Sequence, residues 1–111
     1  MKLGEIKGER SFEVLANLTT PIIRIAKDKS VRELFEKKTI KKGEDPTEVF
    51  LSRMETGLPA LITSHARDFA EIMAIINDQS TDEYIEGVTP IQLFADVMEL
   101  MTDEELLAFL A

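Results

Sequence analysis

The 111-residue sequence combines 44% hydrophobic with 31% charged residues, carries a net charge of −8 and contains no cysteine. These values favour one soluble globular domain over a disordered chain, and they exclude disulfides and thiolate metal sites. We expect no membrane span, because no stretch approaches roughly 18 uninterrupted apolar residues, and no signal peptide, because the start of the chain lacks a continuous apolar run.

The first predicted helix covers residues 9–27. Apolar side chains recur there at steps of three and four, which is the spacing of one amphipathic helical face. Ser11 is a candidate cap at its start. Pro21 predicts a break or kink, because proline lacks the N–H and clashes with the preceding turn, and Thr19–Thr20 would then cap a second piece. The stripe consists of Phe12, Leu15, Leu18, Ile22 and Ile25.

Two segments near the first helix, residues 1–8 and residues 37–45, are predicted to lack helix. Residues 1–8 are assigned to an extended N-terminal arm, with a short strand over residues 2–7 as the less favoured alternative. After the first helix, Ser30 and Glu33 form a capping-box pattern that predicts a short helix. The basic, glycine-containing segment 37–45 has no helical stripe and is predicted to be a loop.

The middle of the chain predicts two helices. Asp45 is a candidate cap with Pro46 at the first helical position, which is a strong helix start. Gly57–Pro59 is expected to interrupt that helix, and the next one runs to about Asn77. Its residues at core-like spacing are Leu61, Ile62, Phe69, Ile72, Met73 and Ile76.

The last third carries three clear helix starts. Ser80–Glu83 forms a capping box that opens a short helix closed by Gly87, Thr89–Pro90 opens the next, and Thr102–Glu105 forms a further box. The sequence therefore predicts an all-α fold of five to seven helices in one domain, residues 1–111, without internal repeats. The apolar face after Pro90 comprises Leu93, Phe94, Val97, Leu100 and Met101.

Charge is unevenly distributed along the chain. Residues 1–45 hold 11 Lys/Arg and 8 Asp/Glu, a net of +3, whereas residues 46–111 hold 2 and 13, a net of −11. The halves attract each other within one molecule, or the acidic half meets a basic surface of another protein or of a second copy packed head to tail. Nucleic-acid binding is disfavoured, because the basic cluster Lys37, Lys38, Lys41 and Lys42 includes no aromatic residue for stacking.

No catalytic, cofactor or metal motif emerges. The single histidine, His65, lies three positions before Asp68, and such a pair can act as a base and its orienting acid. The neighbouring Ser64 cannot serve as its nucleophile on a helix, since adjacent residues do not face each other. A structural histidine is the favoured interpretation. Acids at 103–105 suit the positive end of a helix dipole, and no phosphate-binding glycine loop occurs.

The last residues are unusually apolar. Four large apolar side chains fall within residues 106–110, which is more than a one-faced helix needs. This segment either docks into the core or presents apolar surface to a partner. Methionines nearby fill a core or provide an adaptable binding surface. The candidate partner-binding residues are Phe94, Met98, Met101, Leu106, Leu107, Phe109 and Leu110.

Three stretches, GEIKGERSFEVLANLTTPIIRIAKD, LPALITSHARDFAEIMAIINDQSTDEYIEG and TPIQLFADVMELMTDEELLAFL, carry a resemblance over roughly the whole chain. The sequence resembles a family of phage and prophage tail assembly chaperones. The resemblance implies an all-α, non-enzymatic protein without cofactors, acting in the bacterial host cytoplasm. Its implied partner is the long helical tape measure protein, which it keeps soluble while tail tube protein polymerises around it. Homo-oligomers are also implied.

Two other classes of protein remain as alternatives. One is a structural subunit that stays in the finished tail or virion, and the other is a small acidic regulator that binds a basic protein. An enzyme is the least favoured class, because no residue constellation supports one.

Overall fold

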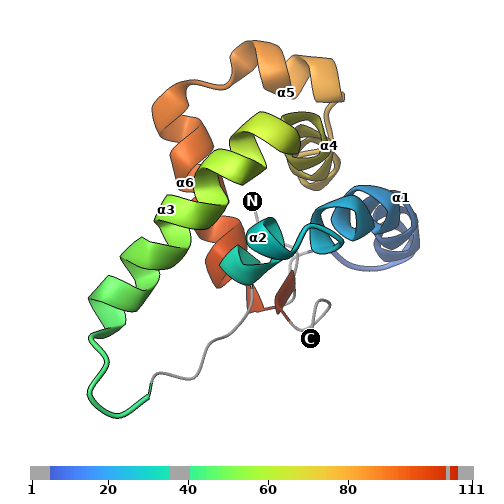
Figure 1. Cartoon of the computed structure of the whole chain (residues 1–111). Helices are drawn as coiled ribbons and strands as arrows, with labels where there is room; N and C mark the ends of the chain where they lie inside the picture. The colour runs from blue at the N-terminus through green and yellow to red at the C-terminus, as the bar shows by residue number, and fades with distance from the viewer. Residues whose placement is uncertain (1–5, 36–40, 105, 108–111) are drawn as a thin grey trace.

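The computed structural model describes residues 6–35, 41–104 and 106–107, and within these ranges every regular element is a helix. This confirms the predicted all-α fold and its number of helices. The elements in chain order are α1 (Glu9–Ala26), α2 (Lys29–Arg32), the 3-10 helix η2 (Glu33–Phe35), α3 (Pro46–Ser64), α4 (Ala66–Ile76), α5 (Thr81–Gly87) and α6 (Pro90–Thr102) (Figure 1).

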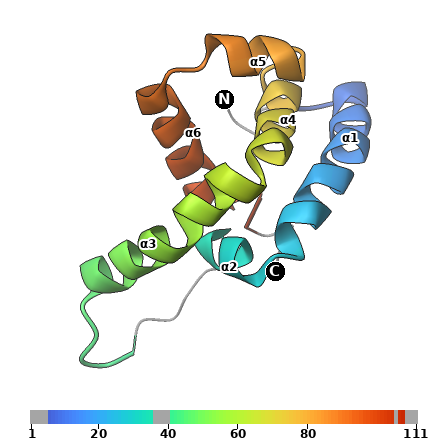
Figure 2. The same ribbon diagram turned by 45° about the horizontal axis from the view of Figure 1, so that its top comes forward.

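Helix α4 is the centre of the packing. It lies against α1 on one side and α5 on the other (Figure 2). The short α2–η2 segment packs against α3, and η2 also contacts α6. The core contains Phe69, Met73 and Leu61, all fully enclosed, and its other members include Val14, Leu18, Ile22, Ile25, Val31, Leu34, Phe35, Ile72, Ile76, Tyr84, Val97, Leu100 and Leu106.

Helix α1 is continuous through Pro21, so the predicted break is wrong. Pro21 is fully buried, and burying its ring together with neighbouring apolar side chains offsets the roughly 3 kcal/mol that an internal proline costs a helix. Thr19 does not cap a second piece, because its hydroxyl donates to the Leu15 carbonyl at 2.8 Å. Ser11 does not cap the start either, since Gly8 is the N-cap and the Ser11 hydroxyl donates to the Ile6 carbonyl.

Only part of the predicted α1 stripe faces the core. Leu18, Ile22 and Ile25 are buried, but Phe12 and Leu15 are exposed. Steps of three and four also connect positions on adjacent helical faces, so periodicity alone joined two faces into one. Val14 is a core position that periodicity missed, and Pro21 is another buried position outside the predicted stripe.

Helix α3 runs unbroken past Gly57 and Pro59, so the interruption predicted there is also wrong. Gly57 is buried against η2, where an added Cβ would come within 2.8 Å of Leu34 Cδ2 and closer still to Leu34 Cγ. The glycine is thus required for a close approach between η2 and α3. The helix ends instead before His65, which separates α3 from α4.

Some predicted caps form as expected. The Asp45 side chain accepts from the Thr47 N–H at 2.9 Å, and Ser80 and Glu83 form the full capping box at the start of α5. Thr89 accepts from the Gln92 N–H at 3.1 Å and caps α6. In the predicted loop at 37–45, residues 41–45 are non-helical, whereas 37–40 lie outside the described residues, as do 1–5 of the predicted arm.

Two other caps are displaced from their predicted positions. The α2 cap is Asp28, whose carboxylate accepts from the Ser30 N–H, rather than Ser30 itself. Thr102 is the last residue of α6, and Asp103 accepts from the Leu106 N–H at 3.1 Å in its place. An aspartate nearby caps in each case, because its carboxylate reaches the free N–H two or three residues later.

Candidate functional site

Helix α6 has apolar side chains on two faces. Val97 and Leu100 point into the core. Ile91 and Phe94 are 83% and 49% exposed and lie on a face of the same helix that is turned away from Leu100. Half-buried Met98 continues this side one turn later. We call Ile91, Phe94 and Met98 the outer α6 face. A helix that serves only the core needs one apolar stripe, so the outer α6 face is available for a partner.

The sequence-predicted partner-binding residues divide into three groups. Phe94 and Met98 belong to the outer α6 face, and Met101 is half-buried against the core. Leu106 is buried in the core, and Leu107 packs against it. Phe109 and Leu110 lie outside the described residues. Sequence reasoning missed Ile91, although its position three residues before Phe94 places both on one helical face.

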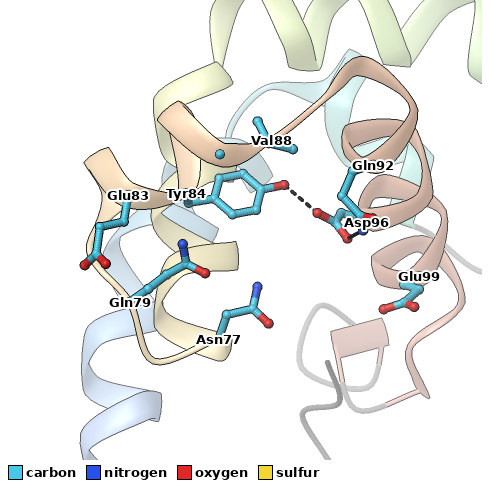
Figure 3. A pocket seen from close by; sticks show the side chains of 9 residues that line it. Asn77, Gln79, Glu83, Tyr84, Val88, Gln92, Asp96 and Glu99 are labelled. Atoms are coloured by element: carbon cyan, nitrogen blue, oxygen red, sulfur yellow. Dashed lines mark hydrogen bonds between the residues drawn. The ribbon is translucent and has the colours of Figure 1, made fainter.

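A polar cleft lies between α5 and α6 (Figure 3). Tyr84 points from α5 toward α6, and its hydroxyl donates to Asp96 Oδ2 at 2.7 Å. Gln92 Nε2 donates to Asp96 Oδ1 at 2.8 Å. The cleft has a volume of about 360 Å³, and its lining residues are Asn77, Gln79, Glu83, Tyr84, Gly87, Val88, Gln92, Asp96 and Glu99.

The buried Asp96 carboxylate holds α5 against α6. A buried charge is costly unless hydrogen bonds satisfy it, and here each oxygen accepts one. Burial raises the pKa of the Tyr84 hydroxyl above its ordinary value, and the hydrogen bond to Asp96 and its negative charge raise that pKa further. Tyr84 therefore stays protonated and remains a donor to Asp96. This arrangement fixes the start of α6 and with it the outer α6 face.

The segment of sequence that carries the outer α6 face is strongly acidic. Residues 80–111 contain eight Asp/Glu and no Lys or Arg. Such a surface attracts basic segments and repels acidic ones. Within the described ranges, no group of three or more histidine or acidic side chains is arranged as a potential metal site.

His65 belongs to a second polar cluster, at the corner between α3 and α4. Its Nε2 lies 2.9 Å from Asp28 Oδ2, and its Nδ1 lies 3.3 Å from Asp68 Oδ2. Arg24 Nη1 donates to the other Asp68 oxygen at 3.0 Å. Both imidazole nitrogens are thus occupied by carboxylates from different elements. In this arrangement His65 links the segment between α1 and α2 to the start of α4, and both of its nitrogens contact carboxylates rather than Ser64.

The electrostatics of this cluster favour a charged imidazole. Partial burial lowers the pKa of His65, but hydrogen bonds to Asp28 and Asp68 and the charges of these carboxylates outweigh it, so the pKa lies above its ordinary value. The hydrogen bond with His65 holds the pKa of Asp28 below its ordinary value. A protonated imidazole donates to both carboxylates at once, which strengthens both contacts.

None of the described helices combines the length and apolar character required to cross a bilayer. In comparisons with known proteins, no family model, no curated protein and no solved structure matches this chain.

Proposed function

We propose that this chain is a non-enzymatic tail assembly chaperone that binds the tape measure protein of a phage or prophage in the bacterial cytoplasm. The observation that carries the proposal is the outer α6 face, where Ile91 and Phe94 stand exposed in a segment rich in acids and free of bases. The resemblance described for the sequence supplies the identity of the client.

The physical requirements of such a chaperone support the proposal. A long helical client exposes apolar stripes before it is enclosed, and a groove or face of exposed apolar side chains covers them. Met98 adds an adaptable contact at the edge of this face. The net charge of −8 then keeps the complex soluble, because like-charged complexes repel one another.

Co-expression with the tape measure protein of the same gene cluster tests the proposal. We expect the chain to raise the soluble fraction of the client and to co-purify with it. The double variant Ile91→Ser/Phe94→Ser removes the two exposed apolar side chains of the outer α6 face and should abolish both effects. Leu51→Ser on α3 is the control, since it removes an apolar side chain that is 57% exposed on another helix and should change neither. Absence of a complex with the unaltered chain would refute the function.

A structural tail subunit would use the same apolar face permanently. Mass spectrometry of purified particles separates the two functions, because an assembly chaperone leaves before the particle is complete. A stoichiometric amount of this chain in finished tails would replace the chaperone by the structural subunit.

A further inference from the structure

Helix α1 carries a second apolar stripe that the core does not use. Phe12, Leu15 and Ile23 are 81%, 53% and 43% exposed. They lie on the side of α1 away from the buried residues Val14 and Leu18, which pack toward α4. Between them lie Ala16 and Thr19, two small side chains that permit close approach of another helix.

Charged residues follow this stripe along one flank. Glu9 and Glu13 lie on that flank at the start of α1, and Arg24 and Lys27 lie on it at the end. All four side chains are exposed. Arg24 also pairs with Asp68 and Glu71 of α4, so Lys27 is the more available of the two cations. The flank is thus acidic at one end and basic at the other.

This order of charges makes α1 complementary to a reversed copy of itself. We propose that two copies of the chain associate through antiparallel α1 helices around a two-fold axis between residues 17 and 18. Phe12 then packs against the partner's Ile23, because both lie the same distance from the axis. Glu9 and Glu13 meet the partner's Lys27 and Arg24 on the same flank, and the small residues Ala16 and Thr19 lie at the crossing point.

A second copy fits this stripe better than a different protein does. An isologous interface requires that one patch match its own rotated image, in apolar positions and in charge, and the α1 stripe meets both conditions. The stripe is also separate from the outer α6 face, since α1 and α6 lie on opposite sides of α4 (Figure 2). The pairing through α1 leaves the outer α6 face of both copies open.

The oligomeric state in solution tests the pairing first. Sedimentation of the unaltered chain over a range of concentrations should show a monomer–dimer equilibrium. Phe12→Ser/Leu15→Ser should raise the dimer dissociation constant more than ten-fold with an unchanged helical circular dichroism spectrum, because both side chains are exposed. Ile91→Ser/Phe94→Ser should leave the constant unchanged. Loss of the dimer in the α6 variant as well would indicate a head-to-tail contact of α1 with α6 and overturn the two-fold pairing.

Charge exchange and cross-linking test the antiparallel register. Glu9→Lys or Lys27→Glu alone should weaken the dimer, and the two together should restore it, because residue 9 of one copy meets residue 27 of the other across the two-fold axis. The chain has no cysteine, so Ala16→Cys introduces a single thiol near the axis. Mild oxidation should join two copies of that variant covalently, whereas Leu51→Cys should not react in this way. A monomer at all concentrations, or failure of both the rescue and the cross-link, would overturn the proposal.

Discussion

Gly57 on α3 and Ile91 on α6 occupy opposite environments on their helices, one tightly packed and the other exposed. At Gly57 the absence of a side chain lets η2 approach so closely that Leu34 fills the space of a Cβ. At Ile91 a large apolar side chain stands 83% exposed and touches little of its own molecule. The first position is determined by packing within the chain, whereas nothing within the described chain requires the second. The close approach of η2 to α3 therefore contributes to the stability of the fold, whereas the Ile91 side chain is left exposed on the surface.

The largest expected effect follows from filling the space at Gly57. Gly57→Ala should destabilise the protein by about 3 kcal/mol, because the new methyl group overlaps Leu34 near its branch point and η2 must move. Urea unfolding followed by circular dichroism measures the loss.

Gly87→Ala is the matched control for this substitution. Gly87 is also helical, but no atom lies within 4 Å of an added Cβ, so alanine should be neutral or stabilise by up to about 1 kcal/mol. The double variant Gly57→Ala/Leu34→Ala should lose less than the two single losses together, since Leu34→Ala removes the overlap. Additive losses would contradict the contact.

The same comparison shows what could be predicted from the sequence. The side chains of Asp45, Ser80 and Thr89 each accept a hydrogen bond from an N–H two or three residues later. Because these contacts are local in sequence, all three caps were predicted correctly. Pro21 and Gly57 were misassigned as helix breaks, because their helices persist through contacts with residues distant in sequence. Local propensity is overridden wherever such packing compensates it.

The candidate site could be predicted only in part, because residues distant in sequence decide which face of a helix is buried. Phe94 could be named from its apolar neighbours, but periodicity cannot tell which of two apolar faces on one helix meets the core. That ambiguity placed Phe12 and Leu15 in the stripe with Leu18, and it left Ile91 unnoticed. Leu106 is a buried member of the core, and the sequence alone left its location undecided.

Substitution within the His65 cluster is expected to cause a pH-dependent loss of stability. This loss should be smaller than that of Gly57→Ala and larger than that at an exposed position such as Ile91. Because the pKa of His65 is raised, the charged imidazole stabilises the fold fully at pH values below the unfolded-state pKa of 6.5. This stabilisation is lost as pH rises through the folded-state pKa. Asp28 has a lowered pKa, so its contribution is present above its unfolded-state value of 3.8 and is lost as pH falls through the folded-state value. Both contributions are present together between these two pH values.

His65→Gln should therefore lower the melting temperature more at pH 5.5 than at pH 8.5. Asp28, Asp68 and Arg24 are the charged groups that face the imidazole. A glutamine at this position is uncharged, and its amide can donate to only one of the two carboxylates. Arg67→Gln serves as the control, because Arg67 pairs with Asp82 at 3.8 Å through two exposed side chains and should contribute little at either pH. An equal loss at both pH values would show that the imidazole acts only through packing.

The smallest effect on stability is expected on the outer α6 face, and the two faces of α6 allow a direct test. Ile91→Ala should change the free energy of unfolding by no more than about 0.5 kcal/mol, as for most surface substitutions. Val97→Ala, on the same helix, removes two methyl groups from a fully buried side chain and should cost about 2 kcal/mol. Because Ile91 then contributes little to folding, loss of client binding in its variants can be attributed to the surface. A large stability loss at Ile91 would instead mean that this side chain packs within its own chain, and the outer α6 face would no longer be a candidate binding surface.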